Sequence, residues 1–374
     1  MNPSKDKLIE SKGAFFSLLV LGFVVLPWLY GNDVLSIGDI NMLGRYMSFA
    51  ILALGLGLLW GYVGIHRLGQ FTVVGLGAYA MGMHLAHHGG QEGIIDANGW
   101  KIPACLFVVY PYDVGESSGD ALGPGFWKPF WNLPLTVLLG LLIPAGTAFV
   151  LGYFVFRSRV RGVYFAILTQ AIAVAAWLVF CRNDVMLCGT NGLVRFDVIA
   201  PSESFHTFHP VDATESWIAS HGGDMEYDLN GDGKLDQLDY SVADVGFSLK
   251  SERVLLWLYW ITLACLFGAY LLCRWIVRSR LGKVLVAIRD DESTLNFFGY
   301  KPHLYKIFAF CVAALLAGIA GMLFVPQMKI VTPSNIEAYR SVLVVVLVAV
   351  GGRSSLGGAI LGALSVNLLY NYLT

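Results

Sequence analysis

Residues 133–181 read LPLTVLLGLLIPAGTAFVLGYFVFRSRVRGVYFAILTQAIAVAAWLVFC, two long apolar runs on either side of a short basic loop. A helix needs about 20 apolar residues to cross the hydrocarbon core of a bilayer. The runs 133–156 and 163–181 are long enough, or nearly so, and neither contains a charged residue. They predict two membrane-spanning helices joined by the loop 157–162.

Comparable runs recur along the chain. The last apolar stretch, 342–373, is too long for one crossing and is interrupted by GGRSSLGG at 351–358. Irregular backbone at membrane depth must be packed within protein or lie at an interface, so this stretch forms either two short helices or a re-entrant hairpin. The sequence predicts an all-α polytopic transmembrane helix bundle of about 8–9 spans. The clear spans are 13–30, which we expect to be retained rather than cleaved as a signal peptide, 46–63, 68–88, 133–156, 163–181, 254–273 and 307–325.

The composition agrees with a membrane protein. Apolar residues make up 56% of the 374 residues and charged residues 14%, and the mean hydropathy is +0.63. A soluble domain has about 25% charged residues. The net charge of −1 leaves no basic surface for nucleic acid, so the expected surroundings are the lipid bilayer and other proteins.

Lysine and arginine are distributed unevenly between alternate loops, which predicts the orientation of the chain. One set of loops holds 14 of these residues in 55 positions, and the other set holds 10 in 146 positions. The richer set is expected on the cytoplasmic side, together with the N-terminus. It comprises 1–12, 64–67, 157–162 and 274–306, and the poorer set comprises 31–45, 89–132, 182–253 and 326–340.

Two long loops therefore face outward, and they divide the chain into three parts. Residues 1–196 form the N-terminal transmembrane helices with the outer loop 89–132. Residues 197–250 form an inserted periplasmic lobe, and residues 251–374 form the C-terminal transmembrane helices with the cytoplasmic loop 274–306.

The sequence contains no motif for self-powered transport or for catalysis. GxxxxGK[ST], which would hold a triphosphate, does not occur, and neither do HExxH and GxSxG. No Asp or Glu lies in the middle of the seven clear spans, where an ion-coupled carrier would need one. These absences predict a chain that is not an enzyme, and leave a passive pore or a translocator driven by a partner.

The cytoplasmic segment CRWIVRSRLGKVLVAIRDDESTLNFFGYKPHLYKIFAF (273–310) has a basic stem, an acidic cluster and a short helical stretch that ends at Gly299. Glycine adopts the positive φ that ends a helix more easily than other residues. An amphipathic helix lying across the inner face would suit docking into a partner's groove. The alternative is a solvated loop that is anchored by its positive charge.

This segment and four others resemble ABC-importer permeases of the branched-chain amino-acid type. The likeness covers most of the chain outside the two outer loops, and FRSRVRGVYFAILTQA, FCRNDV and CRWIVRSRLGKVLVAIRDDES are most similar to the urea-transporting branch. The other segments are GYVGIHRLGQFTVVGLGAYAMGMHL (61–85), RSRVRGVYFAILTQAIA (157–173), GTNGL (189–193), and LAGIAGMLFVPQMKIVTP (316–333) with VAVGGRSSLGGAILGA (348–363).

The resemblance implies a permease subunit of an ATP-driven importer in the bacterial inner membrane, most similar to those for urea or short amides. The alternatives are a branched-chain amino-acid permease and a passive channel for small neutral solutes. Implied partners are a second homologous permease, two cytoplasmic ATP-binding subunits that hydrolyse ATP, and a periplasmic substrate-binding protein. No cofactor is required. Family members continue with another apolar helix after a segment like SVNLLYNYLT (365–374), so this chain is expected to lack it.

Two groups of site residues follow. In the resemblance, the cytoplasmic loop is the coupling loop that the ATPases push; the residues expected at that contact are Ala287, Arg289, Asp291, Glu292 and Gly299. A path for a small neutral solute needs polar groups without full charges. Polar residues in or at the ends of spans are the candidates, with helix–helix hydrogen bonding as the alternative role for each: Gln70, Tyr79, Thr169, Gln170 and Asn191.

The periplasmic lobe contains DLNGDGKLDQLD (228–239), which has the spacing of an EF-hand loop. Gly233 permits the sharp turn, and oxygen ligands at these positions wrap a calcium ion; the alternative is a polar turn without metal. Asp239 replaces the usual bidentate Glu, which weakens the site. The predicted ligands are Asp228, Asn230, Asp232, Lys234 through its backbone carbonyl, Asp236 and Asp239.

A second cluster, HLAHH, places His84, His87 and His88 at the outer end of a span. Their spacing suits a transition-metal site, and interfacial histidines without metal are the favoured interpretation.

Overall fold

The computed structural model describes a helical bundle with gaps in the outer loops. The described residues are 22, 36–88, 93–95, 101–103, 106, 125–158, 162–194, 196, 249, 252–352 and 355–373. The first predicted span, apart from residue 22, and the predicted calcium loop lie outside the described residues.

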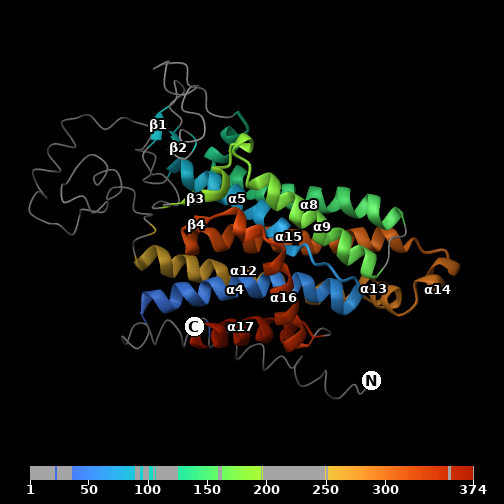
Figure 1. Cartoon of the computed structure of the whole chain (residues 1–374). Helices are drawn as coiled ribbons and strands as arrows, with labels where there is room; N and C mark the ends of the chain where they lie inside the picture. Colours follow the sequence, from blue (N-terminus) through green and yellow to red (C-terminus); the bar gives the residue numbers. More distant parts are fainter. Residues whose placement is uncertain are drawn as a thin grey trace, which may run out of the picture.

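Long helices run side by side through the bundle (Figure 1). Within the described part of the chain, five helices are long and apolar enough to cross a membrane, which confirms the predicted fold class. They are α4 (Ile37–Gly57) with its π-helical continuation η2 (Leu58–Val63), α8 (Leu133–Arg157), α12 (Glu252–Arg278), α15 (Pro302–Met328) and α17 (Leu356–Leu373).

Three further apolar helices belong to the described part of the bundle: α5 (Gln70–His88), α9 (Val163–Phe180) and α16 (Ala338–Gly351). The predicted runs 68–88 and 163–181 match α5 and α9 closely. Local capping sets some of the boundaries. Ser36 and Asp39 form a reciprocal capping box at the start of α4, which satisfies backbone N–H groups that have no intrahelical partner.

Helix α15 lies at the centre and packs against α4, α5 and α8. A ridge of small residues allows this close packing, because backbones approach when no large side chain intervenes. Ala313 and Ala317 are fully buried. A Cβ on Gly321 would meet the backbone carbonyl of Val74 in α5. Ala313, Ala317 and Gly321 recur at four-residue spacing and so form one packing surface of α15.

The apolar stretch from 342 onward contains two helices, α16 and α17, which both alternatives left open by the sequence would place there. In Figure 1 the ribbon of α16 crosses the long helices to reach α17. The two helices pack tightly where glycines face each other: a Cβ on Gly358 would meet the carbonyl of Gly351, and one on Gly362 would meet that of Leu347. The facing ends of α16 and α17 are thus closely packed against each other.

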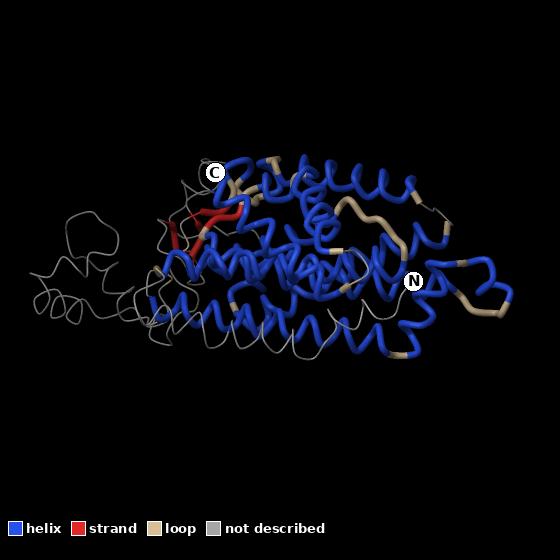
Figure 2. The backbone as a smooth tube through the Cα atoms, turned by 90° about the horizontal axis from the view of Figure 1, so that it is seen from below, coloured by secondary structure: helices blue, strands red, loops and turns tan. Residues whose placement is uncertain are grey.

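The two ends of the bundle differ (Figure 2). One end, here called the strand end, carries the short antiparallel pairs β1 (Gly93–Ile95) with β2 (Lys101–Pro103) and β3 (Leu193–Val194) with β4 (Ile330–Val331). It also carries the 3-10 turns η3 (Gly125–Trp131), η4 (Asn183–Val185), η5 (Gly189–Asn191) and η8 (Pro333–Ile336). The other end, here called the α13 end, carries α13 (Arg280–Asp290) and α14 (Glu292–Phe297).

Three buried histidines attach η3 to α5 at the strand end. His84 Nδ1 lies 2.8 Å from the Phe130 carbonyl oxygen, and His88 Nε2 lies 2.9 Å from that of Trp131. His87 Nε2 lies 3.2 Å from the carbonyl oxygen of Trp127. Because carbonyls only accept, each of these ring nitrogens donates. These hydrogen bonds hold η3 against α5.

Candidate functional site

The α13 end is built from two short helices whose ends are fixed by local hydrogen bonds. Ser279 caps α13 by accepting from the N–H of Gly282. Asp291 caps α14: its carboxylate accepts from the N–H of Ser293 at 2.9 Å and from both the N–H and the hydroxyl of Thr294. Hydrogen bonds to the charged form, above all that of the Ser293 hydroxyl, lower the pKa of the Asp291 carboxyl to about 2.

Gly299 ends α14, as predicted from the sequence. Its φ is +80°, its N–H donates to the Asn296 carbonyl at 3.0 Å, and the N–H of Tyr300 donates to the Leu295 carbonyl at 3.2 Å. These paired bonds satisfy carbonyls at the end of the helix and favour glycine at the left-handed position.

Arg289 and Glu292 make contacts within the chain. Arg289 Nη1 donates to the Gly61 carbonyl at 2.7 Å and Nε to Asp290 at 3.0 Å. Glu292 forms an ion pair with Lys306 in α15, 2.7 Å between Oε1 and Nζ, and the two side chains are only 19% and 11% exposed. Arg289 and Glu292 therefore tie α13 and α14 to η2 and α15. Ala287 is half-buried, and its carbonyl accepts from the N–H of Asp291 at 2.9 Å.

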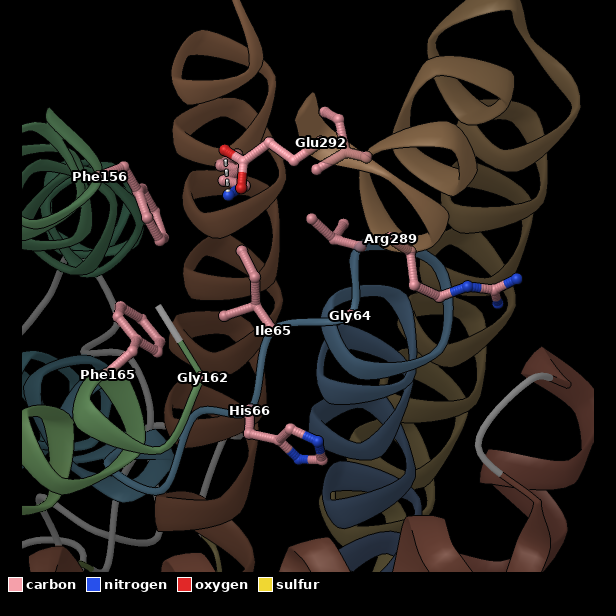
Figure 3. Close-up of a pocket in the computed structure, with 11 residues that line it drawn as sticks. Gly64, Ile65, His66, Phe156, Gly162, Phe165, Arg289 and Glu292 are labelled. Atoms are coloured by element: carbon pink, nitrogen blue, oxygen red, sulfur yellow. Dashed lines mark hydrogen bonds and ion pairs between the residues drawn. The ribbon is translucent and has the colours of Figure 1, made fainter. Parts of the chain in front are cut away.

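A cavity of about 130 Å³ lies between these helices and the rest of the bundle. Figure 3 shows Arg289 and Glu292 on one side and the rings of Phe156 and Phe165 on the other, with the loop 64–66 below. The two rings stack with centroids 5.2 Å apart. The α13–α14 pair thus makes two polar contacts with the bundle beside its buried apolar side chains, and the cavity lies between the pair and α8 and α9.

Two exposed aromatic side chains stand at the C-terminal end of α14, beside exposed polar residues. Phe297 is 90% exposed and Phe298 is 69% exposed. Exposed large apolar side chains beside polar residues mark interaction sites. The sequence analysis did not single out these two phenylalanines; the signal available was the pair FF directly before Gly299 in a segment that is otherwise polar.

The predicted pathway residues divide into two groups. Gln70 is fully buried, and neither atom of its amide has a hydrogen-bond partner within the described part of the chain. The Tyr79 hydroxyl and Gln170 Oε1 are likewise buried without a partner among the described residues. These groups lie on α5 and α9, and the Tyr79 ring contacts Phe180 edge-on at 4.7 Å. Unpaired polar atoms at such depth are costly.

Thr169 and Asn191 differ from these three. The Thr169 hydroxyl donates to the Ala166 carbonyl of its own helix at 2.9 Å, and it accepts from the N–H of Leu68 in the loop before α5 at 3.2 Å. Asn191 is exposed in η5 at the strand end. The structure therefore does not bring all five residues together.

Two buried polar groups were missed by the sequence analysis. Arg67, in the loop between η2 and α5, is 2% exposed. Gln327, near the end of α15, donates to the Thr262 hydroxyl at 2.8 Å, which links α15 to α12. Gln327 could have been predicted, because it is a single Gln among apolar residues. The burial of Arg67 could not be predicted from its position in a loop.

Among the described residues, no group of three or more His, Cys, Asp or Glu is placed to hold a metal ion. The predicted calcium ligands Asp228 to Asp239 lie outside those residues. Cys188 is disulfide-bonded, whereas Cys181, Cys265, Cys273 and Cys311 are free.

The apolar helices long enough to cross a bilayer indicate an integral membrane protein. The chain belongs to the family of permease components of branched-chain amino acid transport systems, whose family model matches residues 39–374.

Two relatives are similar over nearly the whole chain, and both are named high-affinity branched-chain amino acid transport system permease protein LivM. The protein of Escherichia coli (strain K12) is 25% identical over 359 residues, which cover 95% of this chain and 67% of the relative. That of Salmonella typhimurium (strain LT2) is 25% identical over 347 residues, covering 92% and 65%. The chain thus spans about two thirds of the length of these relatives. No solved structure matches it.

Proposed function

We propose that the chain is the translocation subunit of an ATP-driven importer in the bacterial inner membrane. It works with a second homologous permease, two cytoplasmic ATP-binding subunits and a periplasmic substrate-binding protein. The N-terminus and the α13 end face the cytoplasm. The excess of Lys and Arg in the loops at that end supports this orientation, and family membership supports the assembly.

The observation that carries this proposal is the pair of exposed aromatic side chains on α14. Phe297 and Phe298 are held away from the bundle by a capped, six-residue helix that ends at Gly299. Aromatic residues are enriched at the centres of protein interfaces. We infer that they insert into a groove of an ATP-binding subunit, while Ala287, Arg289, Asp291, Glu292 and Gly299 position them.

Two polar contacts would transmit motion of α13 and α14 to the rest of the bundle. Glu292 would pull on Lys306 and hence on α15, the central helix. Arg289 would pull on Gly61 and hence on η2. The 130 Å³ cavity leaves room for the helix pair to move against Phe156 and Phe165. Closure of the ATP-binding subunits would in this way be converted into rocking of the bundle.

The proposed substrate is urea or a short amide. Gln70, Tyr79 and Gln170 offer buried donors and acceptors without a full charge, which suit a small neutral solute rich in hydrogen-bonding groups. The alternative is a branched-chain amino acid, which is favoured by the names of the LivM relatives. A passive channel would conduct without ATP.

Uptake of labelled urea and labelled leucine by cells lacking this chain tests the function. We expect the wild-type chain to restore energy-dependent urea uptake, and Phe297→Ala/Phe298→Ala to abolish it at unchanged abundance in the membrane. Tyr372→Ala removes an equally exposed aromatic side chain, 88% exposed at the end of α17, and should leave uptake intact. Leucine uptake instead would overturn the substrate, and uptake without an energy supply would overturn the ATP-driven mechanism.

We also propose that the loop 228–239 binds calcium and stabilises the periplasmic lobe. The proposal depends on ligand spacing alone, and extracellular loops of this kind bind at about 10⁻⁴–10⁻³ M. Radioactive calcium binding to the full chain in detergent should saturate in this range and be lost in Asp228→Ala/Asp232→Ala. Equal binding by the two proteins would remove the proposal.

A further inference from the structure

A second, larger cavity of about 520 Å³ lies between α5, α8 and α9. Its walls are almost entirely apolar and include Leu76 from α5, Val150 and Leu151 from α8, and Ile172 and Ala176 from α9. The outward faces of the two flanking helices are also apolar: Phe154 on α8 is 65% exposed and Ile167 on α9 is 59% exposed. The cavity is therefore bordered by surface that suits lipid hydrocarbon.

Among the described residues that line this apolar cavity, Arg67 is the one cation. Arg67 is 2% exposed, and its Nε and Nη1 have no hydrogen-bond partner among the described residues. Its guanidinium lies over the ring of Phe310, 4.4 Å from the centroid, a contact that involves no anion. A buried charge without a partner is strongly unfavourable, and arginine stays protonated at any physiological pH. The arrangement indicates that an anion from outside the chain completes the site.

The other polar groups on the walls are few. The hydroxyls of Thr147 and Thr169 already donate to the carbonyls of Pro144 and Ala166. Thr72 Oγ1 is buried without a partner among the described residues and lines the same cavity. A transported polar solute would find little to bind here. A molecule with an anionic head and a long apolar tail fits both the guanidinium and the walls.

We propose that this cavity binds an anionic phospholipid, whose phosphate pairs with Arg67 and whose acyl chain lies against α5, α8 and α9. Basic pockets between membrane helices bind lipid headgroups in this manner, with the arginine as a fork-shaped donor to phosphate oxygens. The proposal depends on the location of the chain in a membrane and not on the proposed transport.

The site adjoins the coupling helices. The Phe310 ring, over which the Arg67 guanidinium lies, contacts the rings of Phe156 and Phe165 edge-on, with centroids 5.7 and 5.9 Å apart. Those two rings line the smaller cavity beside α13. The loop that carries Arg67 also begins at Gly64, which lies against Arg289. A bound lipid would therefore stabilise the loop and the aromatic wall against which the coupling helices move.

Native mass spectrometry of the full chain, purified in detergent and supplied with phosphatidylglycerol or phosphatidylcholine, tests the proposal. We expect the wild type to retain phosphatidylglycerol preferentially. Arg67→Gln should weaken its retention by about fivefold, the contribution of one basic residue to binding of an anionic lipid. Arg157→Gln is the matched control, because it removes an exposed arginine in the last turn of α8. This variant should not change the retention of phosphatidylglycerol.

A second pair of variants keeps Arg67 and fills the cavity instead. Gly146 lines the cavity, and a Cβ added there meets nothing, so Gly146→Phe should fold and exclude the acyl chain. Gly268→Phe adds the same ring at another open helical position, on α12, and should retain lipid. Equal retention of both lipids by the wild type would overturn the proposal, as would full retention by Arg67→Gln or Gly146→Phe. Displacement by inorganic phosphate or by leucine would show instead a site for a free anion or a carboxylate solute.

Discussion

The α13 end and the interior around α5 use polar and apolar side chains in opposite ways. At the α13 end the polar groups pair with one another, as Glu292 does with Lys306, while Phe297 and Phe298 are exposed. Around α5 the apolar side chains are packed, and polar atoms such as those of Gln70 have no partner among the described residues. The first pattern suits a protein partner and the second suits a small ligand.

The largest expected effect comes from breaking the polar pairing at the α13 end. Glu292→Lys would place two ammonium groups together where both side chains are largely buried, at a cost of about 3–5 kcal/mol for losing a buried pair. We expect energy-dependent uptake to fall by more than about tenfold while the bundle still inserts. The charge-swapped variant Glu292→Lys/Lys306→Glu should recover much of the uptake. Normal uptake by the single variant would show that the pair has no part in coupling.

The next effect concerns the packing of the interior. Gly321→Ala places a methyl group against the Val74 carbonyl, and overpacking of this kind costs about 1–3 kcal/mol. We expect a lower thermal midpoint for the purified chain. Gly268→Ala adds the same methyl where nothing lies within contact, and should leave the midpoint unchanged or slightly higher. Equal midpoints for the two variants would contradict the close approach of α5 and α15.

Two buried tyrosines allow a finer test of the interior. The Tyr79 hydroxyl has no partner among the described residues, whereas that of Tyr259 donates to the Gly22 carbonyl at 2.8 Å. Tyr259→Phe should lower the free energy of unfolding by about 1 kcal/mol. Tyr79→Phe should leave stability unchanged or raise it, and should reduce uptake if the hydroxyl faces the substrate. A loss of stability in Tyr79→Phe as large as that in Tyr259→Phe would indicate a structural role.

The smallest effect is the capping of α14. The pKa of the Asp291 carboxyl is lowered to about 2 in the folded chain, against about 3.9 in the unfolded chain. The stabilisation of α14 by this cap is therefore fully present above about pH 3.9 and is lost as the pH falls through the folded pKa. Hydrogen exchange at the Ser293 and Thr294 amides should therefore keep the same protection factors between pH 7 and 5. Asp291→Ala should lose protection there, and Asp291→Asn should keep it, since asparagine caps equally well. Loss of protection on going from pH 7 to 5 would contradict the capping role.

The sequence predicted the helices well because crossing a bilayer requires long apolar runs, and the observed ends of α5, α8 and α9 lie close to those runs. Gly299 was predictable because a glycine with positive φ commonly ends a helix, and this is a local preference. The Glu292–Lys306 pair was not, since it joins residues 14 positions apart across a turn. Arg67 was assigned to a short basic loop; its burial arises only when α5, α9 and α15 assemble around it.

Site-specific photo-crosslinking in native membranes tests the central claim most directly. A photoreactive phenylalanine analogue at Phe297 is compared with one at Tyr372, which lies in α17. The account predicts that position 297 captures an ATP-binding subunit in high yield, that ATP changes this yield, and that position 372 captures none. Equal yields at the two positions, or capture of no ATP-binding subunit at 297, would contradict the assignment of α14 as the element through which the importer is driven.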